Sequence, residues 1–370
     1  MLPPPATLGR PVDEVDTPAL LLDLDAFEAN VGRMADFARS AGMKLRPHAK
    51  SHKCPEIALR QVAAGAVGIC CQKVSEAEAM VDGGVADVMV SNEVVGAAKL
   101  ARLAALAKRA RVSVCVDDAG NVAALAAAAD AAGAPLDVFV EIDVGARRCG
   151  VAPGEEAVRL ALAIAASPRL RFAGLHAYHG SAQHLRTLAE RSAAIAHAAA
   201  EAQRTRDLIE RAGLACPLVT GAGTGSFTFE AASRVYGELQ PGSYVFMDAD
   251  YGRIDWEGLP RFAQSLFILT TVMSAPVPER VVVDAGLKAH SIDSGMPLVH
   301  ERPGLEYAKA SDEHGVVNVA PGAARPALGE KLRLVPGHCD PTVNLYDWIV
   351  GVRGGRVEAV WPIAARGAFY

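Results

Sequence analysis

Several features are scarce in this sequence of 370 residues, and each absence removes a class of function. Aromatic residues make up 5% of the chain, and 37 Lys and Arg stand against 42 Asp and Glu, for a formal net charge of −5. Without a basic excess, the chain lacks the field that would hold nucleic acid or an anionic membrane surface. No apolar run reaches the roughly 20 residues of a membrane-spanning helix. We therefore expect neither a nucleic-acid partner nor a membrane.

Signals for secretion and for disulfide bonds are also missing. The segment MLPPPATLGRPVDE has neither the cationic start nor the apolar centre of a signal peptide, so we expect a cytoplasmic protein. The seven cysteines are an odd number, and no two of them form a CxxC pair. Such cysteines make a poor disulfide framework and a poor zinc knuckle. We expect most of them to be small buried hydrophobic residues.

What the sequence does contain is a repeated strand–helix unit. Over the first two thirds, short apolar strands alternate with amphipathic helices at intervals of roughly 25 to 40 residues, about eight times. This pattern predicts an α/β fold, a (β/α)8 barrel. A doubly wound open sheet is the alternative, but no GxGxxG follows the first predicted strand. The predicted strands are 19–24, 44–48, 68–71, 87–91, 112–117, 137–143, 172–178, 218–220 and 238–245.

The pattern changes near residue 255. From Phe262 onward, β-rich segments such as SLFILTTVMS and ERVVVDAGLKA replace the long helical runs, and turn clusters such as APVPER separate them. This change predicts a second, mainly antiparallel β domain. We expect residues 17–255 to form the barrel, and residues 1–16 and 256–370 to form the β domain.

The segment KLRPHAKSHK (44–53) is the richest in reactive side chains. In an extended strand Arg46, His48 and Lys50 share one face, and a lysine at the end of a barrel strand lies at the mouth where barrel enzymes hold their sites. Partial burial beside other cations would lower the pKa of Lys50 and allow it to form a Schiff base. A basic loop with solvated lysines at 50 and 53 is equally compatible with this segment alone.

Three further segments are candidates for anion binding. In TGAGTGS (220–226), glycines let backbone N–H groups approach a phosphate, and Thr224 and Ser226 add hydroxyl donors. PGSYVFMD (241–248) is a second Gly-Ser turn nearby in barrel order. EIDVGARRCG (141–150) ends a strand with arginines that suit a phenolate or carboxylate. The simpler interpretations are a flexible turn and a surface ion pair.

Two segments contain candidate metal or acid–base residues. GLHAYHGSAQH (174–184) has three histidines, although a single histidine is more often structural. In VPGHCDP (335–341), His338 and Asp340 point the same way if the segment is extended. One imidazole and one carboxylate form an incomplete shell, which suits Mn²⁺ or Mg²⁺ better than structural Zn²⁺. DEHG (312–315) is a candidate for supporting these ligands.

Taken together, these segments resemble a known enzyme family. A lysine at the end of an early strand, a central Arg-Cys-Gly, a late Gly-Thr-Gly-Ser loop and a C-terminal β domain resemble the fold-type III pyridoxal-phosphate enzymes, which have the alanine-racemase barrel. Within that group the chain is similar to the branch of D-threonine aldolases and D-serine dehydratases. The matching motifs are RPHAKSHK, GICCQKVSEAE, SNEVVG, IDVGARRCG, AYHGSAQH, GAGTGS, GSYVFMDADYG, VDAGLK, DEHG and VPGHCDP.

The resemblance implies a role for each matching residue. Lys50 matches the lysine that binds pyridoxal 5′-phosphate covalently, and Arg148 matches the arginine near the 3-oxygen of this cofactor. The remaining cofactor contacts that it implies are Tyr178, Thr224, Gly225, Ser226, Gly242, Ser243 and Tyr244. Ala222 departs from the pattern, because the family usually has a third glycine there.

The resemblance also separates aldolase from dehydratase. His338 and Asp340 match the divalent-metal pair of the D-threonine aldolases, whereas the dehydratases resemble His-x-Cys at these positions. Here Cys339 directly follows the histidine, and residue 340 is Asp. The match therefore favours an aldolase that uses a divalent metal, with Mn²⁺ or Mg²⁺ favoured over Zn²⁺.

The implied reaction is cleavage of a D-configured β-hydroxy-α-amino acid to glycine and an aldehyde. His179, His184 or a metal-bound water are candidates for the base that takes the hydroxyl proton. The alternatives are an aldolase of 3-hydroxy-D-aspartate, a dehydratase of D-serine or 3-hydroxyaspartate, and a non-catalytic carrier of pyridoxal phosphate. A hydrolase that uses metal alone would need a fuller His/Asp set. Because the family often pairs subunits, we also expect a homodimer.

Overall fold

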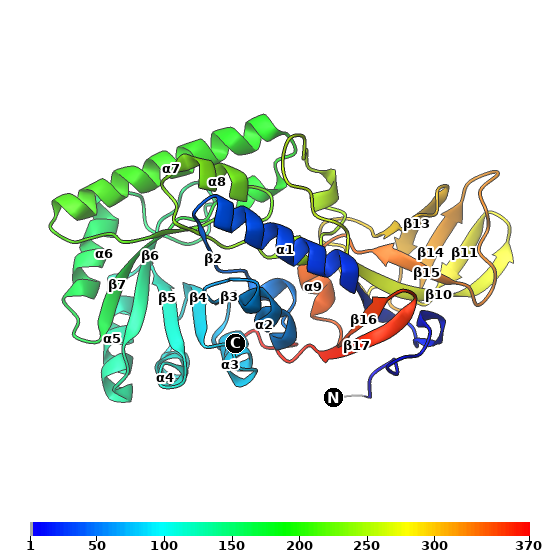
Figure 1. Cartoon of the computed structure of the whole chain (residues 1–370), viewed down its shortest axis with the longest axis horizontal. Coiled ribbons are helices and arrows are strands. Elements are labelled where there is room, and N and C mark those ends of the chain that lie inside the picture. The colour runs from blue at the N-terminus through cyan, green and yellow to red at the C-terminus, as the bar shows by residue number, and fades with distance from the viewer. Residues whose placement is uncertain (1–2) are drawn as a thin grey trace.

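The computed structural model describes residues 3–370, and its barrel is built on a curled parallel sheet (Figure 1). In the described chain this sheet has eight strands in the order β2-β9-β8-β7-β6-β5-β4-β3. An isolated bridge between His48 and Cys70 links its two ends. The predicted α/β barrel is therefore confirmed. The strands are β2 (Lys44–Leu45), β3 (Ile69–Cys71), β4 (Asp87–Glu93), β5 (Arg111–Val116), β6 (Leu136–Glu141), β7 (Leu170–His176), β8 (Val219–Gly221) and β9 (Glu238–Leu239).

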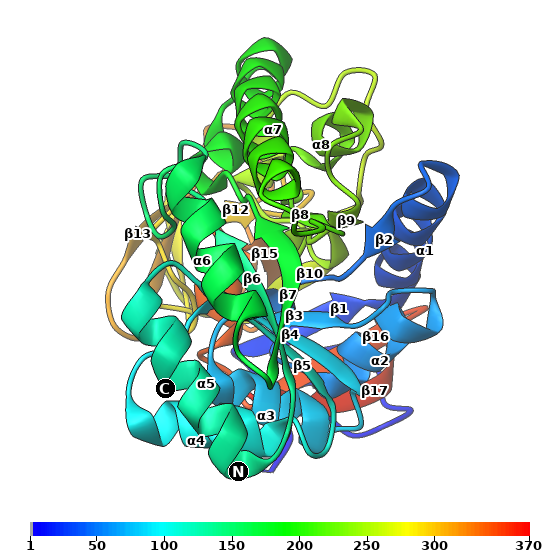
Figure 2. The same ribbon diagram turned by 90° about the vertical axis from the view of Figure 1, so that its left-hand side faces the viewer.

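Helices cover the outside of this sheet (Figure 2). They begin and end at the residue types that satisfy free backbone groups: Asp118 accepts a hydrogen bond from Asn121 N at 2.8 Å, and Gly133 ends the same helix in a left-handed conformation. Burial on both faces explains why the strands are apolar runs rather than alternating ones. The helices are α2 (Pro55–Ala63), α3 (Val74–Asp82), α4 (Ala97–Leu106), α5 (Ala119–Ala132), α6 (Glu155–Ala165), α7 (Leu188–Arg211) and α8 (Phe227–Ser233).

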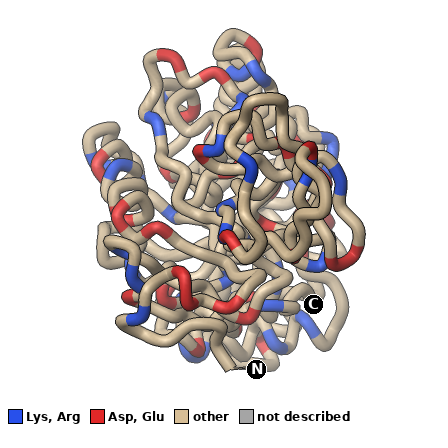
Figure 3. Tube along the Cα trace, turned by 90° about the vertical axis from the view of Figure 1, so that its right-hand side faces the viewer, with Lys and Arg blue, Asp and Glu red and all other residues tan. Residues whose placement is uncertain are grey.

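The second sheet is mainly antiparallel, as predicted for the C-terminal part. Its main path is β13-β14-β11-β10-β1-β16-β17, and β15 pairs with β10 and β12. Figure 3 views the molecule from this side, where positive and negative residues are interspersed. The strands are β1 (Ala19–Asp23), β10 (Leu266–Val277), β11 (Arg280–Val283), β12 (Leu298–Val299), β13 (Leu305–Ala310), β14 (Gly315–Val319), β15 (Lys331–Val335), β16 (Trp348–Arg353) and β17 (Arg356–Pro362).

The prediction for the first strand was wrong. Residues 19–24 were expected to open the barrel, but Ala19–Asp23 forms β1, which pairs antiparallel with β10 and parallel with β16. Leu20, Leu21 and Leu22 are all fully buried, so this strand needs cover on both faces, and the centre of the second sheet provides it.

Helix α1 (Leu24–Ser40) then leads from this sheet to the barrel (Figure 1). Its buried face includes Phe27 and Met34, which belong to one apolar cluster with Leu45 of the barrel and Ile268 of the second sheet. The two sheets therefore share a core. Among residues 3–370, no helix combines the length and the apolar character that crossing a membrane requires.

Candidate active site

The carboxyl ends of the barrel strands surround one pocket of about 450 Å³, including its opening to solvent. This is the end of a barrel at which enzymes of this architecture hold their sites. The lining residues are His48, Lys50, Ser51, Gln72, Ser91, Arg148, His176, Tyr178, Ala222, Gly223, Thr224, Gln240, Gly242, Ser243 and Tyr251.

Lys50 reaches the pocket from a turn rather than from a strand. Strand β2 ends at Leu45, and Lys50 is the middle residue of a short 3-10 helix, η2 (Ala49–Ser51). The Lys50 Nζ atom lies 3.0 Å from Asp340 Oδ2. The attraction of this carboxylate raises the pKa of Lys50, so the predicted lowering was wrong. Neighbouring cations were expected to dominate, but the nearest charge is negative.

His338 and Asp340 lie at the start of helix α9 (Cys339–Val343), not in the extended segment that was expected. His338 Nδ1 is 2.7 Å from Asp293 Oδ2, which leaves Nε2 for a ligand. Metal-binding histidines commonly hold a carboxylate with their second nitrogen, so this donor set fits a divalent cation. Burial alone would raise the pKa of Asp340, but Lys50 and His338 outweigh it and lower the pKa.

The residue that holds the His338 ring is Asp293. The DEHG segment (312–315), which was expected to support His338 and Asp340, does not do so. Residues 311–314 contact the chain around Gly286 instead, for example through the Asp312 carbonyl, which accepts from Lys288 N at 3.0 Å. Asp293 was missed because it is 45 residues from His338 in a polar turn without a metal motif.

The glycine turns pack closely around the pocket. A Cβ atom on Gly242 would lie 2.5 Å from Ser51 Oγ, and one on Gly223 would lie 2.5 Å from the side chain of Gln183. Ser51 Oγ is buried and has no hydrogen-bond partner. The amine of Lys50, the guanidinium of Arg148, several hydroxyl groups and glycine backbone thus surround one cavity. This set fits the aldehyde, phenolate and phosphate of pyridoxal phosphate.

The structure brings only part of the predicted cofactor set to the cavity wall. Lys50, Arg148, Tyr178, Thr224, Gly242 and Ser243 line it. In the described part of the chain, the lining residues do not include Gly225, Ser226 or Tyr244. The Ser226 hydroxyl donates to Glu230 Oε1 at 2.7 Å, and the Tyr244 hydroxyl accepts from Gln61 Nε2 at 3.0 Å inside the core. Their roles remain predictions.

Arg148 is held in place by two neighbours. Its Nη2 atom is 3.6 Å from Glu141 Oε1, and its guanidinium carbon lies 5.5 Å from the centre of the Tyr178 ring. A guanidinium that lies over an aromatic ring keeps its own N–H donors free for other partners. Tyr178 and Glu141 therefore orient this cation toward the pocket.

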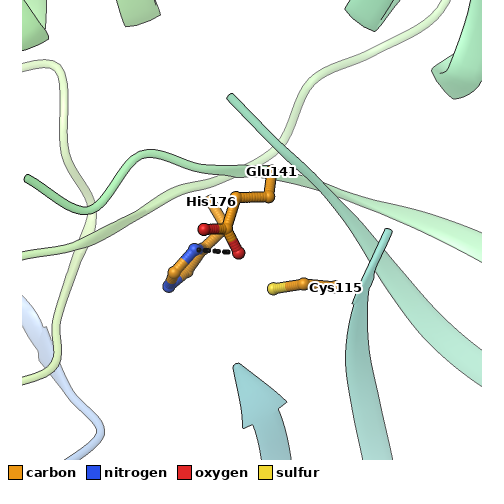
Figure 4. Close-up of side chains that lie close together, drawn as sticks. All are labelled: Cys115, Glu141 and His176. Atoms are coloured by element: carbon orange, nitrogen blue, oxygen red, sulfur yellow. Dashed lines mark ion pairs between the residues drawn. The ribbon is translucent and has the colours of Figure 1, made fainter. Parts of the chain in front are cut away.

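At the pocket floor, His176 lies between Glu141 and Gln240. His176 Nδ1 is 3.1 Å from Glu141 Oε2 (Figure 4). On its other side, His176 Nε2 is 3.1 Å from Gln240 Oε1. Burial alone would lower the pKa of His176, but Glu141 outweighs burial and raises it. The ligand atoms of Cys115, Glu141 and His176 all lie within 4.8 Å of one another, so this buried group is a second arrangement that could hold a metal ion.

The three histidines of residues 174–184 do not converge. His176 faces the pocket floor, His179 Nδ1 is 3.3 Å from Ser181 Oγ, and His184 Nδ1 is 2.7 Å from Asp250 Oδ2. Neither His179 nor His184 is among the lining residues in the described chain. Cys115 and Glu141 were not predicted to be site residues, and the only signal was a cysteine and an acid in otherwise apolar strands.

The family described as alanine racemase, N-terminal domain, matches residues 22–250. The chain belongs to this family. A second family, described as putative serine dehydratase domain, matches residues 265–352. The two matches follow the division into a barrel and a C-terminal β-rich part.

Individual relatives of the alanine racemase N-terminal family are similar over the whole chain. D-threonine aldolase of Arthrobacter sp is 55% identical over 99% of this chain and 97% of its own. 3-hydroxy-D-aspartate aldolase of Paracoccus denitrificans (strain Pd 1222) is 52% identical over 99% and 96%. The crystal structure of D-threonine aldolase from Filomicrobium marinum superposes with a TM-score of 0.98, at 54% identity and complete coverage of both chains. The resemblance stated from the motifs is confirmed.

Proposed function

We propose that this chain is a pyridoxal-phosphate-dependent carbon–carbon lyase that cleaves D-β-hydroxy-α-amino acids of the D-threonine and D-allothreonine type to glycine and an aldehyde. The observation that carries the proposal is the Lys50 amine, 3.0 Å from Asp340 Oδ2, beside a pocket that also holds Arg148. The relatives named D-threonine aldolase and 3-hydroxy-D-aspartate aldolase support the reaction class.

The pocket residues divide the work of holding the cofactor. Lys50 would bind it covalently, Arg148 would face the 3-oxygen, and Thr224, Gly242 and Ser243 would receive the phosphate. The bound cofactor supplies a ring that accepts the electron pair of the broken Cα–Cβ bond. Arg148 is oriented beforehand by Glu141 and Tyr178, so its binding requires little reorganisation.

His338 and Asp340 would hold the divalent metal, with Mn²⁺ or Mg²⁺ preferred over Zn²⁺. Such a cation stabilises negative charge on the β-oxygen of the substrate. Asp293 fixes the His338 ring through Nδ1, and Asp340 is held beside Lys50, so both ligands are held in place by neighbouring side chains. The group of Cys115, Glu141 and His176 is the alternative metal position.

A base is still needed for the hydroxyl proton, and His179, His184 and a metal-bound water are the candidates. Of the two histidines, His179 is the one that we prefer. Burial lowers the pKa of His179, so its ring is neutral near pH 7 and is able to accept a proton. His184 is already engaged by the carboxylate of Asp250 at 2.7 Å.

The placement of Cys339 supports aldolase over dehydratase. Its side chain is fully buried, and its thiol lies 3.3 Å from Asp340 Oδ1. The carboxylate of Asp340, not this thiol, therefore lies beside Lys50. An aldolase of 3-hydroxy-D-aspartate is the second candidate, because the relative of that name is 52% identical.

We also propose that the protein works in the cytoplasm as a homodimer. All seven cysteines are free, which fits a reducing compartment. Its partner molecules would then be a D-amino acid and a second copy of the chain.

The deciding experiment is product analysis with purified protein, pyridoxal phosphate and Mn²⁺. D-threonine, D-allothreonine, 3-hydroxy-D-aspartate and D-serine are tested in parallel, with and without a chelator. Glycine plus an aldehyde supports the proposal, and ammonia plus a 2-oxo acid identifies a dehydratase. Binding of the cofactor without conversion of any of these substrates would identify a carrier.

A further inference from the structure

The C-terminal segment, residues 363–370, crosses from the second sheet onto the barrel. It follows strand β17, and the C-terminus lies beside α3 (Figure 1). The Tyr370 carbonyl accepts hydrogen bonds from Ser75 N at 3.1 Å and from Ser75 Oγ at 2.6 Å. The guanidinium of Arg102 lies 5.3 Å from the Tyr370 ring centre. The end of the chain is therefore attached to the barrel.

Lys53 is the buried residue on which this segment closes. It is 7% exposed, and its ammonium group lies 2.6 Å from Glu76 Oε1 and 3.4 Å from the carbonyl oxygens of both Ala365 and Ala368. An ammonium group has three donors, so all three are used. In return the Lys53 carbonyl accepts from Ala365 N at 3.0 Å. Its backbone has φ +52°, a left-handed conformation that costs a lysine free energy.

Lys53 also closes the turn that carries Lys50. Lys53 N donates to the Ala49 carbonyl at 2.7 Å, across the short helix whose middle residue is Lys50. Its partner Glu76 uses the other carboxylate oxygen to accept from Gln72 N at 2.7 Å, and Gln72 lines the pocket. The contacts of Lys53 thus reach the pocket on two sides, although Lys53 does not line it.

The same segment holds the helix that carries Asp340. Gly367 N donates to Asn344 Oδ1 at 3.0 Å, and Asn344 is the residue that directly follows α9. Arg366 Nη1 is 3.1 Å from Asp347 Oδ1, just beyond that helix. One stretch of chain therefore contacts both the turn of Lys50 and the helix of Asp340, which are 290 positions apart in the sequence.

We propose that Lys53 is a positioning residue: by binding the C-terminal segment, residues 363–370, it sets where the Lys50 amine lies relative to Asp340. The inference rests on the proposed function, in which Lys50 binds the cofactor and Asp340 holds the metal beside it. These contacts between Lys53 and the C-terminal segment fix the positions of the reacting groups without touching the substrate. A displacement of about an ångström at such groups lowers the reaction rate about a hundredfold.

The test uses two variants that disrupt the contacts between Lys53 and the C-terminal segment in different ways. Lys53→Met combined with Glu76→Gln removes the ion pair without leaving a buried unpaired charge. Deletion of residues 366–370 removes most of the segment and leaves Lys53 intact. Lys288→Met, which removes an exposed lysine paired with Glu313, is the matched control.

Four readouts are compared: kcat, KM for D-threonine, the dissociation constant of pyridoxal phosphate from its absorbance, and the fraction of Lys50 that pyridoxal phosphate and borohydride label, by peptide mass. We expect kcat to fall about tenfold or more, with KM changed much less. Cofactor affinity and Lys50 labelling should fall in both variants. A protein that carries both the Lys53→Met/Glu76→Gln change and the deletion should lose little more than either variant alone. Lys53→Arg should restore part of the labelling.

Unchanged labelling and unchanged cofactor affinity in folded variants, judged by circular dichroism, would overturn the proposal. Equal losses in kcat and in the folded fraction would do the same, since they would reduce Lys53 to a stability role. If the wild-type protein cleaves no D-amino acid, the proposed function fails, while labelling and cofactor affinity still decide the role of Lys53.

Discussion

At the scale of single residues, the ion pair of Lys50 and Asp340 determines the charge of the amine at the pocket. A lysine with a carboxylate 3.0 Å away is fully charged near neutral pH, because Asp340 raises its pKa. The amine must therefore lose its proton before it can attack an aldehyde carbon.

Removal of the Lys50 amine is the first prediction. Lys50→Ala should abolish the absorbance near about 420 nm that a lysine-bound pyridoxal phosphate gives, and cleavage of D-threonine should fall below detection. Absorbance spectra of the variant and of a Lys288→Ala control check this. A variant that keeps the band would place the covalent attachment on another lysine.

The second prediction distinguishes the two metal positions. His338→Ala and Asp340→Asn should each remove the bound metal and lower kcat by at least about a hundredfold, because charge on the β-oxygen then has no cation beside it. Cys115→Ser should keep both metal and activity. Metal content by mass spectrometry decides, and loss of metal in Cys115→Ser alone would place the ion at the buried group instead.

The third prediction concerns the pH dependence of stability at the pocket floor. Glu141 has a pKa below its ordinary 4.5, since His176 outweighs the effect of burial, and its contribution is lost as the pH falls through that lowered pKa. His176 has a pKa above its ordinary 6.5, since Glu141 outweighs burial, and its contribution is lost as the pH rises through that raised pKa. The pair therefore stabilises the fold most between pH 4.5 and 6.5.

Glu141→Gln should lower the free energy of unfolding by roughly 3 kcal/mol in this window, because a buried imidazolium loses its partner, and by less at higher pH. Denaturant titrations at several pH values measure it. The double variant with His176→Gln should show little dependence on pH over this range. A loss that stays constant from acid to alkaline pH would contradict the assignment.

At the scale of elements, the Gly242 turn and the η2 turn fit against each other. A Cβ atom on Gly242 would lie 2.5 Å from Ser51 Oγ and 3.1 Å from His48 Cβ. The fourth prediction is that Gly242→Ala weakens pyridoxal phosphate binding about tenfold by pushing the two turns apart. Gly252→Ala is the control, because nothing lies within 4 Å of its added methyl group. Equal cofactor affinity in the two variants would contradict a close fit at Gly242.

At the scale of the whole molecule, strand β1 and helix α1 join the two sheets. Leu22 and Ile268 of the second sheet belong to the same buried cluster as Leu45 of the barrel. The fifth prediction is that Ile268→Ala lowers the free energy of unfolding by about 2 to 5 kcal/mol in one cooperative transition, and that the cofactor is lost with it. Leu298→Ala, at a site 52% exposed, is the control. Two separate transitions would contradict the shared core.

Part of this organisation follows from local rules. The alternation of apolar strands and helices predicts the barrel because each unit must bury its apolar face against its neighbours. The antiparallel part follows from turn clusters between β-rich segments. Lys50, Arg148, Thr224 and Gly242 were placed at the pocket because strand ends of a barrel meet at one mouth.

Other features have no local signal. Strand β1 is apolar on both faces, and such a strand fits a barrel and the centre of an antiparallel sheet equally well. The direction of the pKa shift of Lys50 depends on Asp340, and the contacts of Lys53 depend on the C-terminal segment. His179 and His184 share a motif with His176 but not its pocket.

The sequence by itself determined the fold class, the family and several of the residues that line the pocket, since these depend on periodicity and on short motifs. Only the tertiary structure decided which charged side chains lie next to one another. Electrostatic and hydrogen-bond effects act over a few ångströms of space, and the partners concerned are hundreds of residues apart along the chain.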